Sequence, residues 1–126
     1  MKNIILFWID DMENWASSAQ TNLQLISLKN KIKINIVSAR NGEDIVQVCM
    51  AHNFDAIIMD YNMEPFNGDK YIKDIRFEEH LEHIPIIFYS QDNSADLDNL
   101  VRGVPNVTTV YRGNLEDKIK ELFFED

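Results

Sequence analysis

Short segments rich in β-branched and aromatic residues recur along the chain, and each is followed by a segment with helical periodicity. Segments of this length and composition are typical of strands that are buried on both faces of a parallel sheet. The expected strands cover residues 4–9, 32–37, 55–59, 85–89 and 107–111. Parallel strands that alternate with helices are joined by right-handed crossovers. The sequence therefore predicts an α/β fold, a doubly wound five-stranded parallel sheet with five helices.

Apolar residues between the expected strands recur three or four positions apart, which marks the buried face of a helix. The inward faces are predicted to comprise Trp15, Ala19, Leu23 and Ile26; Ile45, Val48 and Cys49; Tyr71, Ile72 and Ile75; Leu97, Leu100, Val101 and Val104; and Leu115, Ile119, Leu122 and Phe123. The second helix is expected to begin at residues 41–43, and the fourth to end near Gly103 and Pro105. No repeat or linker interrupts this alternation, so we expect residues 1–126 to form one domain.

Composition argues against several classes of protein. Hydrophobic residues make up 45% of the 126 residues, which is ordinary for a folded domain. The formal net charge of −9 argues against direct binding of nucleic acid and against adhesion to anionic membranes. No apolar stretch approaches the roughly 20 residues of a membrane span. The single cysteine, Cys49, fits a reducing compartment, and we expect the protein to be cytoplasmic.

Aspartates follow two of the expected strands: Asp10 and Asp11 follow the first, and Asp60 follows the third. Ligands of open α/β sheets bind at the carboxyl ends of the strands. Carboxylates that meet there repel one another, and a hard cation such as Mg²⁺ removes this penalty. A plainer alternative is that the first two cap a helix and the third lies in a turn. The placement after two strands favours an acidic metal and phosphate site.

The chain resembles the receiver domain of two-component response regulators over essentially its full length. The resemblance rests on the acidic pair, on the loop from Asp60 to Gly68 with Met63 three residues after the aspartate, and on Ser90 after the fourth strand. Ser90 lies 30 residues after Asp60, and Arg112 lies 22 residues after Ser90; both spacings look typical of the family. The resemblance implies the flavodoxin-like receiver fold.

It also implies a role for each matching position. Asp60 would be the phosphoacceptor, which attacks a phosphoryl group to form an acyl phosphate. Mg²⁺ would be held by Asp11, Asp60 and the main-chain carbonyl of Asn62, while Asp10 orients a metal-bound water. Ser90 would donate a hydrogen bond to a phosphoryl oxygen.

Three positions depart from the family pattern. Arg112 replaces the usual lysine, and arginine is planar and fork-shaped where lysine carries a compact charge. Arg112 can pair with a phosphoryl group or lock onto Asp60. Gln91 stands where the family favours a very small residue, which predicts a narrower phosphoryl pocket. Thr109 takes the place of a frequent aromatic residue, and Tyr111 lies on the same side of the strand.

The leading functional prediction is a single-domain receiver that takes a phosphoryl group from a histidine kinase or phosphotransfer protein and signals by binding a downstream protein, with homodimerisation left open. It would not be an enzyme for any metabolite, because it catalyses only its own phosphorylation and dephosphorylation. The alternative is a pseudo-receiver that binds partners without phosphorylation. An Mg²⁺-dependent phosphatase is disfavoured because Asn62 occupies the position of its second acid.

Overall fold

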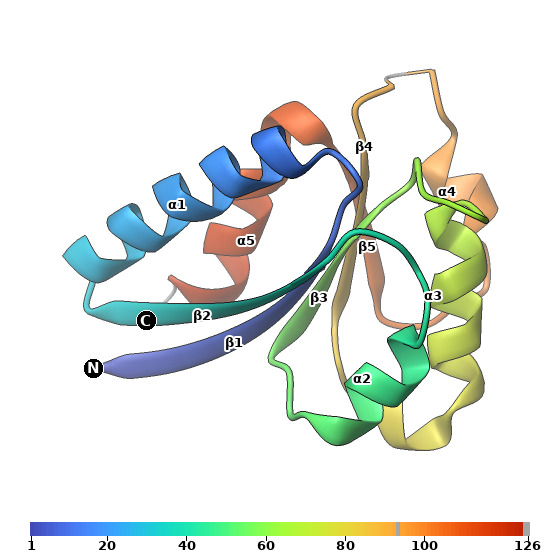
Figure 1. The fold of residues 1–126 in the computed structure, drawn as a ribbon, viewed down its shortest axis with the longest axis horizontal. Coiled ribbons are helices and arrows are strands. Elements are labelled where there is room, and N and C mark those ends of the chain that lie inside the picture. The colour runs from blue at the N-terminus through green and yellow to red at the C-terminus, as the bar shows by residue number, and fades with distance from the viewer. Residues whose placement is uncertain (93, 125–126) are drawn as a thin grey trace.

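The strands form one sheet in which every neighbouring pair is parallel, in the order β2-β1-β3-β4-β5 (Figure 1). This computed structural model describes residues 1–92 and 94–124. The strands are β1 (Lys2–Ile9), β2 (Ile32–Ala39), β3 (Ala56–Asp60), β4 (Ile86–Ser90) and β5 (Val107–Tyr111). The predicted doubly wound sheet is confirmed, and its order places the carboxyl ends of β1 and β3 side by side.

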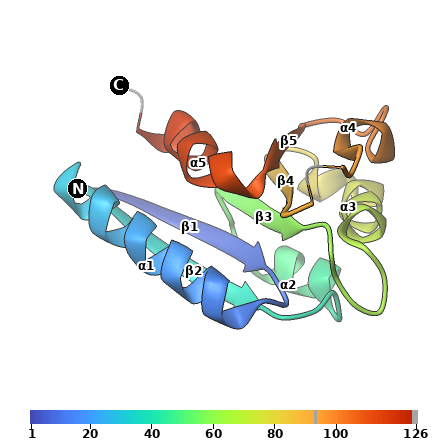
Figure 2. The ribbon, with the colours of Figure 1, turned by 90° about the horizontal axis from the view of Figure 1, so that it is seen from above.

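Helices cover both faces of this sheet (Figures 1 and 2). One face carries α1 (Glu13–Lys29) and α5 (Leu115–Phe123), and the other carries α2 (Ile45–Ala51), α3 (Gly68–Phe77) and α4 (Leu97–Leu100). Two short 3₁₀ turns, η1 (Glu79–Leu81) and η2 (Arg112–Asn114), complete the described elements. No helix in the described ranges is both long and apolar enough to span a membrane.

Two apolar cores form because successive side chains of a strand point to opposite faces of the sheet. On β1, Phe7 and Ile9 pack toward α2 and α3, while Trp8 packs toward α1 and α5. The same alternation on β4 separates Phe88 from Tyr89. Because β3 and β4 are buried along their whole length, their carboxyl ends are held in fixed positions.

Some predicted boundaries and faces were wrong. The second helix begins at Ile45 because the segment before it forms a turn: the Asn41 side chain accepts a hydrogen bond from the Glu43 N–H, and Asp44 has a φ of 57°. The fourth helix spans a single turn. Leu122, predicted to face inward, is 41% exposed, because the buried stripe of α5 follows Leu115, Ile119 and Phe123 at intervals of four residues.

A buried arginine that the sequence did not reveal ties α3 to the loops at the amino ends of β4 and β5. The guanidinium of Arg76 donates hydrogen bonds to the carbonyl oxygens of Leu81, Ile84, Pro105 and Asn106 at 2.6–2.9 Å. Arg76 is only 8% exposed, and its bonds to Leu81 and Ile84 are buried, so water cannot easily replace the guanidinium at these two carbonyls. One side chain therefore satisfies the backbone of two loops.

We expect Arg76→Ala to lower the free energy of unfolding by more than ~2 kcal/mol, because it leaves buried carbonyls without donors. Arg76→Met keeps most of the packing and should still be destabilised, whereas Arg102→Ala, at an exposed position, should stay close to wild type. Urea denaturation of the three variants measures the difference. Equal stability of the Arg76 and Arg102 variants would contradict this account.

Candidate functional site

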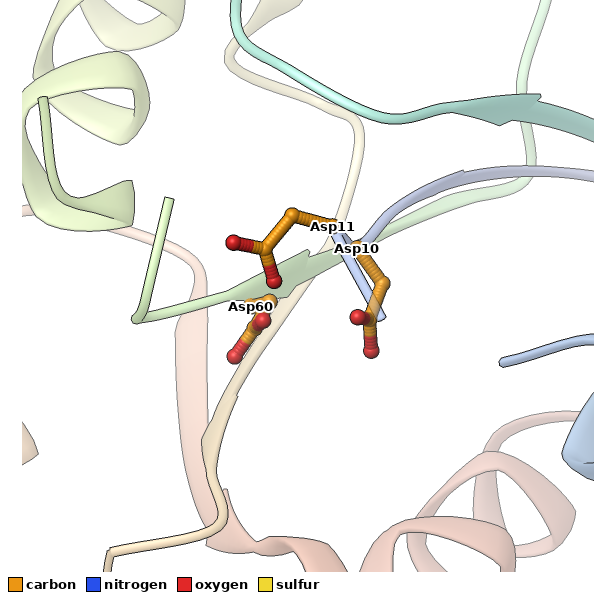
Figure 3. Close-up of side chains that lie close together, drawn as sticks. All are labelled: Asp10, Asp11 and Asp60. Atoms are coloured by element: carbon orange, nitrogen blue, oxygen red, sulfur yellow. The ribbon is translucent and has the colours of Figure 1, made fainter. Parts of the chain in front are cut away.

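Three carboxylates converge at the carboxyl ends of β1 and β3 (Figure 3). Asp10 and Asp11 directly follow β1, and Asp60 is the last residue of β3; the two strands are paired up to Ile9 and Met59. One oxygen from each carboxylate lies within 4.8 Å of the other two. Asp10 and Asp60 are 5% and 4% exposed, while Asp11 is exposed. The sheet thus brings together the three acids that the sequence placed at strand ends.

Burial and mutual repulsion disfavour ionisation of this cluster. Burial, reinforced by the neighbouring charge of Asp10, raises the pKa of Asp60 to about 7. Burial also raises the pKa of Asp10, and a hydrogen bond from Tyr89 opposes the rise. A group whose pKa is raised in this way destabilises the fold while it is ionised. A bound cation would therefore stabilise the ionised form of the cluster.

The spacing of the carboxylates fits Mg²⁺. This ion binds oxygens at about 2.0–2.1 Å in an octahedron, so ligands on opposite sides lie about 4 Å apart. The three carboxylate oxygens all lie within 4.8 Å of one another, which is compatible with this spacing. Asn62 lies next to this cluster, and its N–H donates a hydrogen bond of 3.3 Å to Asp60 Oδ1. The exposed position of Asp11 leaves one side open to water, which Mg²⁺ commonly keeps as a ligand.

A chain of buried hydrogen bonds fixes Asp10. The Tyr89 hydroxyl donates to Asp10 Oδ2, and the Trp8 indole N–H donates to the Tyr89 oxygen at 3.1 Å. The Met12 N–H donates to Asp10 Oδ1 at 2.6 Å. Sequence reasoning missed Tyr89. Its signal was a tyrosine next to the carboxyl end of a central strand, since a buried tyrosine hydroxyl needs a polar partner.

Ser90 ends β4, one residue beyond the position that pairs with Asp60. Its side chain is fully buried, and Ser90 Oγ accepts a hydrogen bond of 2.9 Å from the Asp92 N–H. That bond uses the oxygen as an acceptor and leaves the hydroxyl proton free to be donated. The structure therefore places a hydrogen-bond donor at the same edge of the sheet as the acids.

The loop between β3 and α3 returns closely to the acidic cluster. The Gly68 N–H donates to the Tyr61 carbonyl at 2.8 Å. A Cβ atom on Gly68 would lie 2.1 Å from the backbone oxygen of Asp60, which is far inside contact distance. Only glycine therefore allows α3 to begin this close to the end of β3.

Arg112 lies beside the acids without pairing with them. Within the described ranges, no ion pair joins Arg112 to Asp10 or Asp60. The guanidinium instead stacks over the Trp15 ring, 3.9 Å from its centroid, and donates a hydrogen bond to Gln91 Oε1. The locked Arg112–Asp60 pair that the sequence left open is not formed in this structure.

Thr109, which departs from the family pattern, and Tyr111 both lie on β5. Tyr111 is 41% exposed, and its hydroxyl donates to the Ala95 carbonyl at 3.4 Å. The Thr109 hydroxyl donates to the Asp98 carboxylate. Both side chains thus contact the segment that contains α4 and carry surface polar contacts.

The comparisons with known proteins agree with this geometry. The family model described as response regulator receiver domain matches residues 7–104. The chain belongs to this family, which confirms the resemblance seen in the sequence. Comparison with curated protein sequences gives no match.

Solved structures with the same fold cover nearly the whole chain. A wild-type TrrA response regulator from Thermotoga maritima, crystallised with Mg²⁺ and a beryllium fluoride, is 22% identical, with 98% of this chain and 100% of that one covered and a TM-score of 0.72. CheY4, a chemotaxis response regulator of Vibrio cholerae, is 17% identical with 97% and 100% covered and a TM-score of 0.79. The receiver domain of the hybrid histidine kinase CckA is 18% identical with 94% and 97% covered and a TM-score of 0.68.

We expect Asp60→Asn to stabilise the protein in chelator, and more so at alkaline pH. The pKa of Asp60 is about 7 in the folded state and 3.8 ordinarily, so the stability of the wild type falls as the pH rises between these values. The gain from Asp60→Asn should therefore grow between about pH 4.5 and about pH 8, on the order of 2 kcal/mol. Thermal melts in chelator measure it.

Asp55→Asn is the matched control, because Asp55 is exposed and precedes the opposite end of β3. It should show no gain that grows with pH. Mg²⁺ should reduce the advantage of Asp60→Asn, since the ion stabilises the ionised carboxylate. A loss of stability for Asp60→Asn at both pH values would mean that the acid is favourably paired in the folded state.

Tyr89→Phe should lower the free energy of unfolding by ~1–3 kcal/mol, because Asp10 loses a donor and the Trp8 indole loses an acceptor in a buried place. Tyr111→Phe removes a hydroxyl at an exposed position and should change stability by less than ~0.5 kcal/mol. Urea denaturation compares the two variants. Similar values for both would show that the buried hydrogen-bond chain contributes nothing to stability.

Proposed function

We propose that this receiver accepts a phosphoryl group on Asp60 from a histidine kinase or phosphotransfer protein in an Mg²⁺-dependent reaction. The observation that carries the proposal is the convergence of three carboxylates at the ends of β1 and β3 in a domain of this family. The TrrA structure, which contains Mg²⁺ and a beryllium fluoride, supports it by likeness of fold.

Asp60 acts as the nucleophile in this proposal. A carboxylate oxygen attacks the phosphorus atom, the bond from phosphorus to the donor breaks, and an acyl phosphate forms on Asp60. The attacking group must be ionised, and burial opposes this by raising the pKa of Asp60 to about 7. Asp11, Asp60 and the carbonyl of Asn62 would hold Mg²⁺, which when bound supplies the positive charge that offsets the carboxylates and the incoming phosphoryl group.

In the same proposal, the remaining site residues orient the reacting groups and offset the negative charge of the phosphoryl group. Asp10, fixed through hydrogen bonds from Tyr89 and Met12, would orient a water bound to the metal. Ser90 keeps a hydroxyl proton to donate to a phosphoryl oxygen. Arg112 carries N–H donors in the fork geometry that suits phosphoryl oxygens.

Signalling would follow from binding a downstream protein in the cytoplasm, and the receiver would turn over no metabolite of its own. Receiver domains interact with histidine kinases and phosphotransfer proteins, and one neighbouring structure is itself the receiver domain of a hybrid histidine kinase. The net charge of −9 supports a protein partner over nucleic acid or an anionic membrane.

A phosphorylation-independent pseudo-receiver is the second candidate. The observation in its favour is that Gln91 and Arg112 contact each other at the cavity next to Asp60. If this contact never opens, the domain would bind partners in one fixed state.

The test is the mass of the intact protein after incubation with Mg²⁺ and a small phosphodonor. We expect the mass to rise by one phosphoryl group in wild type and in Asp55→Asn, and to stay unchanged in Asp60→Asn. Asp11→Asn should abolish most of the mass gain that depends on Mg²⁺. The same variant should lose most of the Mg²⁺-induced change in tryptophan fluorescence. Wild type that gains no mass at saturating donor and Mg²⁺, with unchanged fluorescence on adding beryllofluoride, would favour the pseudo-receiver.

A further inference from the structure

Two departures from the family pattern, Arg112 and Gln91, contact each other in the structure. We propose that Gln91 and Trp15 are positioning residues that hold the Arg112 guanidinium beside the acidic site. In this arrangement, called the parked position below, the guanidinium stacks on the Trp15 ring and donates a hydrogen bond to Gln91. Arg112 must leave the Trp15 ring before a phosphoryl group can reach Asp60. The second half of this inference rests on the proposed function.

Three different segments hold the guanidinium. Arg112 begins η2, its guanidinium carbon lies 3.9 Å from the centroid of the Trp15 ring on α1, and it donates a hydrogen bond to Gln91 Oε1 in the segment after β4. Met12 Sδ, just before α1, lies 3.8 Å from an Arg112 nitrogen. A planar guanidinium can lie flat on the ring and donate hydrogen bonds at its edge in a fixed fork geometry, whereas a lysine ammonium is a compact charge without a flat face.

Trp15 is itself held in place by the aromatic residues behind it. Its ring lies 5.8 Å from Tyr89 and 6.4 Å from Trp8, measured between ring centroids. Tyr89 in turn donates a hydrogen bond to Asp10. The surface on which Arg112 stacks is therefore built into the same aromatic cluster that fixes one of the acids.

The parked position covers the phosphoacceptor. A small cavity next to Asp60 is lined by Asp10, Met12, Asp60, Tyr89, Gln91 and Arg112, and it is too small to hold a water molecule. A phosphoryl group, which is larger than water, needs this cavity to open. In its wall, the hydrogen bond from Tyr89 to Asp10 is buried, whereas the bond from Arg112 to Gln91 is exposed to solvent, so separating Arg112 from Gln91 is the simplest opening.

The partners that park Arg112 are neutral: a ring face, an amide oxygen and a thioether. A phosphoryl group adds ion–ion attraction and can accept two parallel N–H bonds from a guanidinium, neither of which these neutral partners provide. Arg112 Nε is also buried without a hydrogen-bond partner among the described residues. A phosphoryl group near Asp60 therefore offers Arg112 stronger acceptors than it has when parked. The parked state is stable without phosphate and is displaced by it.

The first test follows the side chain of Arg112 by NMR and needs no phosphorylation. Stacking over an indole shifts the guanidinium protons upfield, so these resonances of wild type should lie upfield of those in Trp15→Leu. Gln91→Ala should move them most of the way toward the Trp15→Leu values, while Gln47→Ala, an exposed glutamine on α2, should leave them unchanged. Resonances that Gln91→Ala does not move would overturn the parked position.

The second test measures phosphoryl labelling by intact mass over time. Trp15→Leu removes a cation–π contact at a partly exposed site, and Gln91→Ala removes a hydrogen bond. Each loss corresponds to about a fivefold change in the released fraction, so both variants should label about fivefold faster than wild type. In an Arg112→Lys background, Gln91→Ala should give no further increase. An equal increase in both backgrounds would show that Gln91 acts by bulk alone, which overturns the inference.

The two tests separate the inference from the proposed function. If no variant gains mass, including Arg112→Lys, the proposed phosphorylation fails and the release step fails with it, while NMR still decides whether Gln91 and Trp15 position Arg112. If wild type labels but Gln91→Ala labels no faster, the proposed function stands and the release step is wrong.

Discussion

Repulsion between carboxylates at the end of a parallel sheet is the constraint around which this site is arranged. Because β1 and β3 are neighbours and run in the same direction, the acids at their carboxyl ends cannot avoid one another. The surrounding structure provides hydrogen-bond donors to these acids: the Tyr89 hydroxyl and the backbone N–H groups of Met12 and Asn62 each donate to a carboxylate. These bonds reduce the penalty without removing it, since the pKa of Asp60 remains near 7. The negative charge of the carboxylates is therefore not fully offset by the protein, and this favours the binding of a cation.

Arg112 does not offset this negative charge by direct pairing. Arg112 lowers the pKa of Asp60, but burial and the neighbouring acids raise this pKa by more. The guanidinium contacts Trp15 and Gln91 instead of a carboxylate. Because Arg112 forms no ion pair with Asp10 or Asp60 within the described part of the chain, it leaves the carboxylate oxygens of these two acids without a charged partner. Arginine in place of lysine therefore changes where the positive charge lies, because the flat guanidinium stacks face to face on the Trp15 ring.

The sequence predicted the sheet, the α/β class and the meeting of Asp10, Asp11 and Asp60, because these depend on local patterns and on the geometry common to parallel sheets. It placed the final strand at residues 107–111, where the structure has it. It could not predict the start of α2, since Asp44 adopts a left-handed conformation that no hydrophobic pattern records. It also missed the hydrogen bonds of Tyr89 and Arg76, because their partners are distant in sequence and, for Arg76, are backbone carbonyls that carry no side-chain signal.

The contact between Gly68 and the backbone of Asp60 couples the site mechanically to a whole helix. With no room for even one methyl group between them, the start of α3 cannot shift toward β3, and the Gly68 N–H bond to Tyr61 resists a shift away. At its far end, α3 is tied through Arg76 to the loops that precede β4 and β5. The helix α3 is thus fixed at both of its ends, by Gly68 at the carboxyl ends of the strands and by Arg76 at their amino ends. Any displacement of the Asp60 backbone would be carried along α3 to the opposite edge of the domain.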